Sequence, residues 1–578
     1  MNGQDSAPEL TVETVTGIAQ LAGLPLDAAA MAARIAAGAA AASNAVRAAL
    51  ALAPEYDLFA REPSDYLPLL ESLAPQHGQV AGARSSAATG VEPSKAASPN
   101  ATSANAAPWS LDLCELASRL ADRRLRSVEV VRAMLARAEL ANARTRCFLA
   151  IESDTALAAA ELADALLDAA WQSGREPIAP LLGVPLAHKD MFERQGFAAL
   201  CGSRAREPRM ATRSATVMER LELAGAVTIG TLNMAEFALG ATGHNASFGD
   251  CRNAWNPDHI AGGSSSGSGA AVACGAVFAS LGSDTGGSVR IPASANGVYG
   301  LKPTYGLIPR TGSMKLTPSI DVLGPLVRSV RDLARLLQVI AGGDGRDTQC
   351  SLLPVPDYAA ALGRGIEGLR VGVPRNHFLD DLEPSVRAAY ERSLATLEAA
   401  GARLLEVAVP GAEWMAELSR AVVYPEATAL HAAALRARGS DYTPQVRVRA
   451  STGVAIPGTL YLEALQLRLP LLERVVREVF GRCDLLLTPT LPVRVPRRDE
   501  TDIGAGPWLW HLLGRLVHCT APVNYLGLPA LSMPAGVDDR GLPVGVQLVA
   551  APFAEPTLLR AAAVHERSMG ACRLAPLG

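Results

Sequence analysis

Over most of the chain, helical and strand-like hydrophobic patterns alternate. Residues 217–224 carry apolar side chains at helical spacing, and the short apolar run 226–229 follows them. Further along, residues 369–373 predict a strand, 386–400 a helix and 404–409 another strand. This order predicts an α/β fold, in which helices cover both faces of a largely parallel or mixed β-sheet.

Two further helical patterns precede this region. A capping-box sequence at residues 6–9 leads into an apolar stripe that stops at 23–25. Asp27 can cap a second helix, whose stripe runs over residues 31–50. Two amphipathic helices cannot bury both of their apolar faces alone. We therefore expect the segment 1–73 to be either a terminal decoration on the main domain or a small subunit fused to its partner.

The segment 74–108 separates these helices from the rest of the chain. It is rich in Ala, Ser, Gly, Pro and Asn and contains almost no large apolar residue. Such a composition predicts a flexible linker, because the segment cannot bury enough apolar surface to order itself. The chain then consists of a helical accessory segment at 1–73, this linker, and a large domain at 109–578.

Composition and charge exclude several classes of protein. The 578 residues are 49% hydrophobic and 19% charged, which is typical of a globular protein in water. The net charge of −4 argues against a whole-protein affinity for nucleic acid or an anionic membrane. The nine cysteines include no C-x-x-C pair, so we expect neither a disulfide framework nor a zinc site. We expect a cytoplasmic protein, because the chain has no basic signal peptide and no apolar run of about 20 residues.

The most unusual segment is a Gly/Ser-rich block at 262–269, which a second block at 282–290 follows. One interpretation is a phosphate-binding loop before a helix, but the P-loop and dinucleotide-binding patterns are absent. A flexible linker is another, yet apolar sequence flanks the block on both sides. The third is a serine nucleophile at Ser288. Gly286 and Gly287 permit the backbone angles that would turn successive N–H groups towards one point.

A serine nucleophile needs a base, because its hydroxyl is too weakly acidic to attack an amide unaided. No G-x-S-x-G elbow is present, and no Asp/His pair is suggested by spacing. A lysine can act instead if it is desolvated and neutral. Lys189 follows an apolar strand-like run, where a surface lysine is unusual. It is the candidate base, although a solvated lysine is the more common case.

The two Gly/Ser-rich blocks and the Gly-Val-Pro motif before Lys189-Asp190 resemble the amidase signature family. Later motifs continue the resemblance in order, at residues 296–306, 520–530 and 541–548. The resemblance implies a large mixed, mostly parallel β-sheet sandwiched by helices. It also implies a hydrolase that acts on the non-peptide C–N bonds of linear amides and needs neither a metal nor another cofactor.

The resemblance implies a Ser-cis-Ser-Lys triad. Ser288 would be the nucleophile, Ser264 the bridging serine after a cis peptide bond from Gly263, and Lys189 the base. Ser264 would relay a proton between Lys189 and Ser288 and later return it to the leaving amine.

The same resemblance implies an oxyanion hole from the backbone N–H groups of Thr285, Gly286, Gly287 and Ser288. Removing one such donor typically costs about 10²–10³ in rate.

Residues around the triad are expected to support it rather than to react. Asp284 and Arg290 would brace the second block. Ser265 would occupy a position that needs a small side chain, and it would form hydrogen bonds near Lys189. His188 is expected to be a hydrogen-bonded core histidine, although it could also tune the lysine.

Substrate contacts are less visible in the sequence. A loop that borders the acyl pocket in relatives corresponds to residues 233–245 here, so Met234 and His244 are candidate substrate-binding residues, together with Gly263. A structural role is an equal alternative for Met234 and His244. In the A subunits of transfer-RNA amidotransferases, charged residues of a variable region hold the substrate glutamine; the sequence does not place them within 377–460.

The N-terminal helices resemble the small C subunit of glutamyl-tRNA amidotransferase and the short accessory protein of some biuret-pathway hydrolases. If so, the chain is a natural fusion. Tethering would keep the segment at an effective concentration of about a millimolar.

These features lead to one main functional prediction. We expect a serine amidohydrolase that forms an acyl-enzyme from a small-molecule amide and releases ammonia or an amine. The alternatives are the glutaminase A subunit of a tRNA-dependent amidotransferase and a hydrolase of ureides such as biuret or allophanate. A non-enzymatic scaffold is a further class, which an intact triad disfavours. We expect no membrane or direct nucleic-acid partner, and a homodimer is possible.

Overall fold

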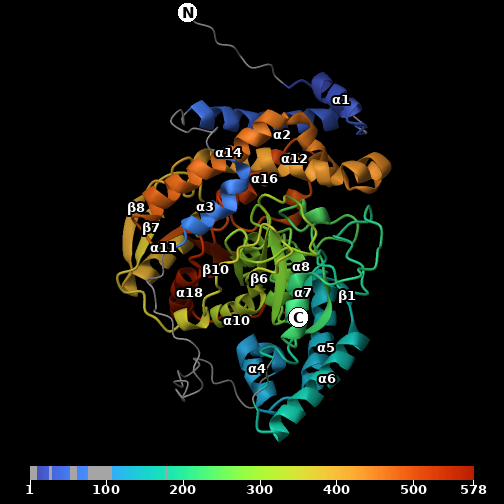
Figure 1. The fold of residues 1–578 in the computed structure, drawn as a ribbon, viewed down its shortest axis with the longest axis vertical. Helices are drawn as coiled ribbons and strands as arrows, with labels where there is room; N and C mark the ends of the chain where they lie inside the picture. The colour runs from blue at the N-terminus through green and yellow to red at the C-terminus, as the bar shows by residue number, and fades with distance from the viewer. Residues whose placement is uncertain are drawn as a thin grey trace, which may run out of the picture.

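The computed structural model places the chain as a large α/β body with helical layers at both ends (Figure 1). It describes residues 10–24, 26, 29–51, 62–75, 107–175, 177, 179–504 and 506–577. The predicted linker therefore lies almost entirely outside the described residues, as do the capping box at 6–9 and Asp27.

The centre of the body is an 8-stranded sheet. In spatial order its strands are β4 (Ala279–Asp284), β6 (Val322–Val327), β5 (Tyr299–Lys302), β10 (Ala530–Val537), β11 (Pro543–Ala550), β9 (Leu485–Pro489), β7 (Arg370–Pro374) and β8 (Arg403–Val407). The β-α-β unit predicted from residues 369–409 is confirmed, with α11 (Pro384–Ala399) between the parallel strands β7 and β8.

The sheet is mixed, as predicted, but not mostly parallel. Strand β7 is parallel to both β8 and β9, whereas the other neighbouring pairs of this sheet are antiparallel. The difference has a physical reason, since β10 and β11 are joined by a short turn and a hairpin connection makes two strands antiparallel. The crossover connection through α11 joins β7 to β8 and allows these two strands to be parallel.

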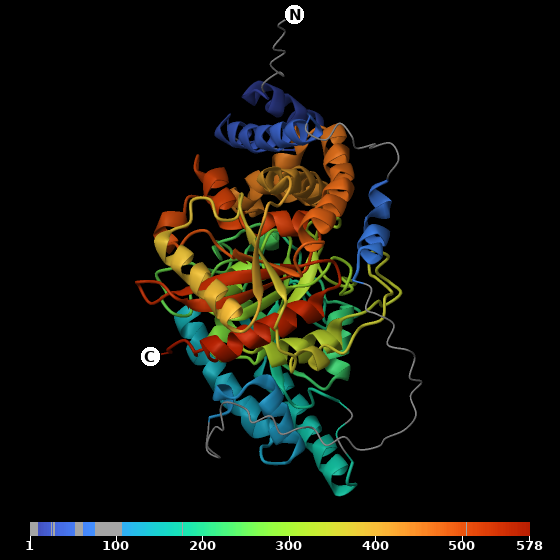
Figure 2. The same ribbon diagram turned by 90° about the vertical axis from the view of Figure 1, so that its left-hand side faces the viewer.

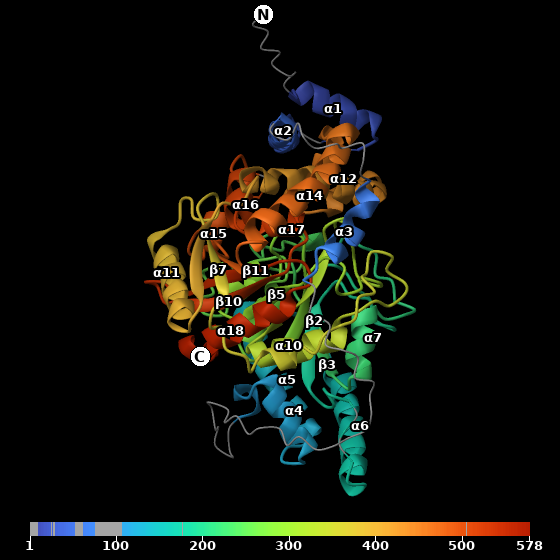
Figure 3. The same ribbon diagram turned by 60° about the vertical axis from the view of Figure 1, so that its left-hand side comes forward.

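Helices cover both faces of the sheet. One layer contains α10 (Val330–Ile340), α11 and α18 (Glu555–Met569); α10 and α11 each contact α18, and all three contact the sheet (Figure 3). The opposite face carries α8 (Ser266–Ala273) and α9 (Arg290–Asn296), which also pack together. Both of these short helices are fully buried. The sequence of α8 is accordingly apolar or small all round, whereas α9 also carries the buried Arg290 and Asn296.

A 3-stranded sheet lies beside this core, in the order β1 (Phe148–Ile151), β3 (Val227–Leu232) and β2 (Pro185–Lys189). Helix α7 (Thr216–Leu223) precedes β3, as the stripe at 217–224 predicted. Strands β2 and β3 are parallel, and Lys189 is the last residue of β2. The helices α4 (Leu113–Ala121), α5 (Ser127–Thr145) and α6 (Ser153–Gln172) close this end of the molecule (Figure 1).

A helical layer covers the other end. It contains α12 (Ala412–Arg438), α13 (Pro444–Ser451), α14 (Gly458–Val475), α15 (Arg498–Thr501), α16 (Leu509–Val517) and α17 (Ala521–Tyr525). The N-terminal helices α1 (Val12–Leu21) and α2 (Ala29–Ala51) lie on the outside of this layer, as Figure 2 shows. Helix α3 (Tyr66–Ser72) packs against α14.

The N-terminal segment shares a hydrophobic core with the large domain. Val15, Ile35 and Val46 are fully buried, in one cluster with residues of α12, α14 and α16. Helix α1 is capped by the hydroxyl of Thr11, which accepts the N–H of Thr14 at 3.1 Å. The predicted stripe over residues 31–50 is the face of α2 that packs on the domain.

Two general features complete the fold. No helix among the described residues is long and apolar enough to cross a membrane. All nine cysteines are free thiols, and most of them are buried.

Candidate active site

Two β-strands bring the candidate base and its partners together. Lys189, at the end of β2, is buried to 1% exposure and lies beside the end of β4. Its Nζ donates to Ser264 Oγ at 2.7 Å and to Ser283 Oγ at 2.9 Å. The structure therefore brings Lys189 and Ser264 into direct contact, and it adds a second hydroxyl, from Ser283, to the same nitrogen.

The environment of Lys189 favours its neutral form. Burial lowers the pKa of the Lys189 ammonium to about 7, and the carboxylates of Asp284 and Asp321 oppose this shift only in part. A lysine with a pKa near 7 is substantially unprotonated at neutral pH, so its nitrogen can accept a proton.

Ser264 lies in the tight loop that leads into α8. The peptide bond between Gly263 and Ser264 is cis, as the family resemblance implied. Gly263 packs against backbone, because a Cβ there would lie 2.7 Å from Gly240 O and 3.0 Å from Gly243 N. The segment therefore has no room for a side chain at residue 263.

Ser288 lies between β4 and α9, in a loop held by buried charges. Asp284 Oδ1 accepts the N–H of Gly287 at 2.8 Å, and Asp284 Oδ2 accepts the N–H of Val289 at 3.1 Å. Arg290 forms an ion pair with Asp284 at 3.0 Å, and neither side chain is exposed. Burial alone would raise the pKa of Asp284, but Arg290, Lys302 and Asn524 together hold that pKa well below its usual range. These contacts match the bracing role expected of Asp284 and Arg290.

Gly287 is required by this loop. Its φ is +126°, and a Cβ would lie 2.4 Å from Thr520 Oγ1. The first block reaches the second through Ser265, whose N–H donates to Ser288 O at 3.2 Å. Ser265 Oγ also donates to Ser283 O at 3.3 Å, so the loops that carry Ser264 and Ser288 are tied together close to Lys189.

The backbone donors beside Ser288 differ in their availability. The N–H of Gly287 is already bound to Asp284. Among the described residues, no hydrogen bond engages the N–H groups of Thr285, Gly286 and Ser288. The structure therefore leaves three of the four expected oxyanion donors free and commits that of Gly287 to the loop.

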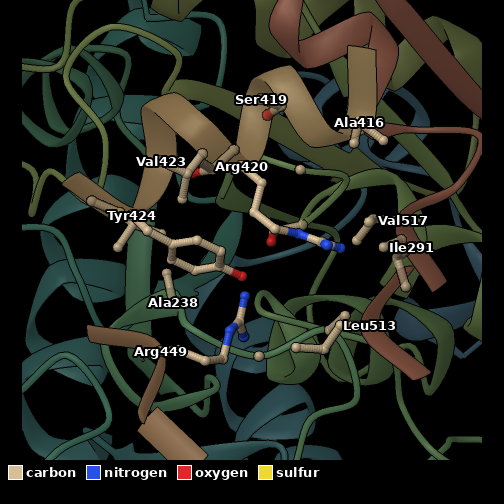
Figure 4. Close-up of a pocket in the computed structure, with 17 residues that line it drawn as sticks. Ala238, Ile291, Ala416, Ser419, Arg420, Val423, Tyr424, Arg449, Leu513 and Val517 are labelled. Carbon is tan, nitrogen blue, oxygen red and sulfur yellow. The ribbon is translucent and has the colours of Figure 1, made fainter. Parts of the chain in front are cut away.

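A pocket opens directly onto these groups. Thr285, Gly286 and Ser288 form part of its wall, and residues of α12, α13 and α16 form much of the rest. Figure 4 shows that the Tyr424 phenol and the guanidinium groups of Arg420 and Arg449 point into this pocket. Apart from Ser419, its remaining lining has apolar side chains such as Ile291, Leu316, Val423, Leu513 and Val517.

One of these guanidinium groups has spare donors. The Nε and Nη1 atoms of Arg449 are buried and have no hydrogen-bond partner among the described residues. Arg420 donates from Nη1 to Glu417 Oε2 at 2.7 Å, and its side chain is 10% exposed. Buried donors without partners are costly, so a guanidinium in this position has the chemistry to bind an anionic group.

The candidate substrate residues predicted from the sequence do not line this pocket. Met234 is fully buried in the hydrophobic core. His244 binds Asp250 through Nδ1 at 3.0 Å and Thr501 through Nε2 at 2.9 Å. Gly263 is enclosed behind Ser264 by backbone. For Met234 and His244 the structure favours the alternative that the sequence left open, a structural role.

His188 also has a structural position. Its Nδ1 accepts the N–H of Leu281 at 3.1 Å, and burial lowers the pKa of the imidazole to about 3. The ring is therefore neutral and hydrogen-bonded in the core, as expected.

Sequence reasoning missed Ser283, Arg420, Tyr424 and Arg449. Ser283 was present in the second block and its place on β4 could have been found from strand alternation. The pocket residues lie on helices with no motif, so only the packing of α12 and α13 over Ser288 reveals them. No group of three or more His, Cys, Asp or Glu residues that could hold a metal ion occurs in the described ranges.

Comparisons with known proteins identify the family of the chain. Residues 129–559 match the model of the Amidase family. The chain is 40% identical over 477 residues to the A subunit of the glutamyl-tRNA(Gln) amidotransferase of Moorella thermoacetica, an alignment that covers 78% of this chain and 96% of the relative.

The chain also resembles solved structures over most of its length. One such structure is described with a vestigial protein complex and an s-triazine catabolic enzyme. Its TM-score is 0.74 and its identity 35%, and the alignment covers 81% of this chain and 100% of the other. A 6-aminohexanoate cyclic dimer hydrolase with bound substrate has a TM-score of 0.73 and 27% identity, covering 82% and 100%. The chain belongs to the amidase family, whose members are amidohydrolases that act on C–N bonds.

Proposed function

We propose that the chain hydrolyses the carboxamide of a small substrate that carries a carboxylate, through an acyl-enzyme on Ser288. The observation that carries the proposal is the contact between the buried Lys189 and Ser264, next to a loop whose Ser288 lines a pocket together with Arg449. The base and the bridging serine meet, and the wall of the pocket holds both the nucleophile and a cation that has unpartnered donors.

In the proposed reaction, neutral Lys189 accepts the proton of Ser264 while Ser264 accepts that of Ser288. Ser288 Oγ attacks the amide carbon, and a tetrahedral intermediate forms. The proton returns through Ser264 to the leaving nitrogen, so ammonia or an amine departs and an ester to Ser288 remains. Water then attacks the ester with the same base, which releases the acid and restores both serines.

The oxyanion of the intermediate would be stabilised by the free N–H groups of Thr285, Gly286 and Ser288. Such donors are effective because the loop already holds them in place before the charge develops. Asp284 and Arg290 would act only by fixing this loop.

The anionic part of the substrate would bind between α12 and α13. Arg449 offers two buried donors, and Tyr424 and Arg420 point to the same space (Figure 4). Arg420 is partly neutralised by Glu417, whereas Arg449 has no ion pair with an acidic residue of the described chain. A carboxylate would give Arg449 the acceptors that it lacks.

Two substrate assignments fit this chemistry. The relative from Moorella thermoacetica favours the glutaminase A subunit of an amidotransferase, in which a partner protein would use the released ammonia on transfer RNA. The other assignment is the ureide alternative expected from the sequence, with a substrate such as allophanate. Both glutamine and allophanate carry a carboxylate. The relatives favour the amidotransferase role over a stand-alone hydrolase.

The N-terminal segment bears on the same choice. Its helices pack on the catalytic body of the same chain and bury a shared core with it. This arrangement supports a small accessory subunit fused in cis. A fusion of this kind is compatible with either assignment.

The test is ammonia release by the purified full chain on matched amides. The panel contains glutamine, succinamate against butyramide, allophanate against biuret, and an anilide, with Ser288→Ala as the blank. The proposal expects turnover of an acidic amide and a higher kcat/KM for it than for its neutral match. Equal kcat/KM values within each pair would overturn the carboxylate assignment. Activity on glutamine that requires transfer RNA and a copurified partner would identify the amidotransferase role.

A further inference from the structure

Helix α2 lies directly on the helix that carries two of the pocket residues. It crosses α12 on the outer surface of the molecule (Figures 1 and 3) and also contacts α13 and α14. Arg420 and Tyr424 belong to α12, and Arg449 belongs to α13. The N-terminal segment therefore touches the elements that hold the pocket, although it does not line the pocket itself.

Trp510 connects α2 to these pocket residues. Its indole Nε1 donates to the carbonyl of Arg34 in α2 at 2.7 Å. The same ring meets Tyr424 edge to face, with centroids 5.3 Å apart. The guanidinium carbon of Arg420 lies 5.5 Å from the indole centroid, within the range of a cation–π contact. One side chain thus joins α2 to two polar residues of the pocket, Tyr424 and Arg420.

The indole fits against α2 only because residue 38 is glycine. A Cβ at Gly38 would lie 2.6 Å from Trp510 Cζ2 and 2.7 Å from Cε2. The surrounding helix is otherwise rich in alanine, and glycine weakens a helix interior relative to alanine. Gly38 therefore costs helix stability, and what the structure shows in return is the close approach of this aromatic ring.

We propose that α2, acting through Trp510, positions Arg420 and Tyr424 and so sets the affinity of the pocket for the substrate carboxylate. Trp510 and Gly38 are positioning residues, because neither touches the pocket space. The inference rests on the proposed function, since it assigns the fused N-terminal segment a role at the carboxylate end of that site. The fusion would then keep this support permanently attached.

The other role open to α2 is simple cover of an apolar surface. Ile35 and Val46 already provide that cover, and both are fully buried. Gly38→Ala separates the two roles, because it keeps the apolar face and raises helix propensity but pushes the indole away. If α2 only buries an apolar surface, this substitution has no selective effect on any substrate. If α2 positions the pocket residues, the substitution weakens the binding of acidic amides.

The experiment compares kinetics on succinamate and butyramide, and on allophanate and biuret, in full-length variants. Gly38→Ala should raise KM for the acidic amides about tenfold, the effect of weakening one charged contact, with kcat changed far less. KM for the neutral amides should stay within about twofold. Trp510→Phe, which keeps a ring but loses the bond to Arg34 O, should raise the same KM values to a smaller extent.

Two controls accompany these variants. Gly17→Ala changes a glycine of α1 where a Cβ would meet nothing within 4 Å, and it should leave every parameter unchanged. Far-UV circular dichroism and the melting temperature establish that each variant is folded. If Gly38→Ala does not fold, Trp510→Phe carries the comparison.

The outcomes distinguish this inference from the function on which it rests. If both variants keep the wild-type KM for acidic amides, or weaken acidic and neutral amides equally, the α2–Trp510 coupling is overturned while the carboxylate pocket stands. If the wild-type enzyme itself shows no preference for acidic amides, the carboxylate pocket is overturned and this role of α2 with it.

Discussion

Lys189 Nζ and Ser264 Oγ lie 2.7 Å apart, and neither side chain is open to solvent. Because burial lowers the pKa of Lys189 to about 7, the ammonium form dominates below that pH and cannot accept a proton. We expect kcat/KM to rise with pH through about 7 and then level off. The measurement is a pH–rate profile on a substrate that does not itself titrate between pH 5 and 9.

Lys189→Arg is the control for this profile. A guanidinium stays protonated at every accessible pH, so the variant should be inactive throughout and show no pH midpoint. A wild-type profile that is flat from pH 5 to 8 would contradict the assignment of Lys189 as the base.

Ser288→Ala should reduce kcat by about 10⁴-fold or more, because the variant has no oxygen to form the acyl-enzyme. The fold should be unaffected, since no side-chain hydrogen bond from Ser288 holds the described structure together. Mass spectrometry after fluorophosphonate treatment should find one adduct on Ser288 in the wild type and none in the variant. Substantial turnover by Ser288→Ala would sink the mechanism.

The features that could be predicted from the sequence are local ones. The β-α-β unit around α11 was predictable, because the hydrophobic periods of its two strands and its helix lie within one segment. The contact between Lys189 and Ser264 depends on residues 75 positions apart. Only the family resemblance could bring these residues together, since no local pattern encodes the pairing.

The prediction of a mostly parallel sheet was wrong for a related reason. The unit at 369–409 is parallel, but the sequence does not show how the strands near the C-terminus pair. For Met234 and His244 the sequence left substrate contact and a structural role open, because only burial and hydrogen-bond partners decide where their side chains point. Arg449 could not be predicted, because an arginine on a helix without a motif looks like any solvated charge.

Ser283→Ala should lower kcat/KM by about tenfold, mainly through kcat. The hydroxyl of Ser283 is the second partner of Lys189 Nζ, at 2.9 Å, so its loss frees the amine to rotate away from Ser264. The pH midpoint should shift downward, because a neighbour that accepts from the ammonium form is removed. Ser280→Ala, a buried serine of the same strand that does not contact Lys189, is the matched control and should change neither quantity.

Arg290→Met should destabilise the fold by about 3–5 kcal/mol, because it leaves the carboxylate of Asp284 buried without its ion-pair partner. The free energy of unfolding from urea titration measures this effect. Arg331→Met provides the comparison, since the Arg331–Asp112 pair is 46% and 29% exposed and should contribute at most about 1 kcal/mol. Similar losses for the two variants would show that the buried pair does not brace the loop.

Arg449→Met should raise KM for the preferred acidic amide by about 10–100-fold, the range for a lost hydrogen bond to a charged group. The substitution keeps much of the aliphatic bulk but removes the guanidinium, which lines the pocket and carries two buried donors without partners. Because the reacting groups of Ser288 and Lys189 are untouched, kcat at saturation should change little. Neutral amides should keep their KM, or bind slightly better in the less polar pocket.

Two further variants sharpen this prediction. Arg449→Lys restores the charge but not the planar fork, so it should recover only part of the affinity. Arg477→Met removes an arginine whose side chain is 71% exposed and should behave as wild type. A loss of kcat that is equal for acidic and neutral amides in Arg449→Met would place Arg449 in the support of the catalytic loop instead. The selective rise in KM is therefore the result that ties the guanidinium to the carboxylate of the substrate.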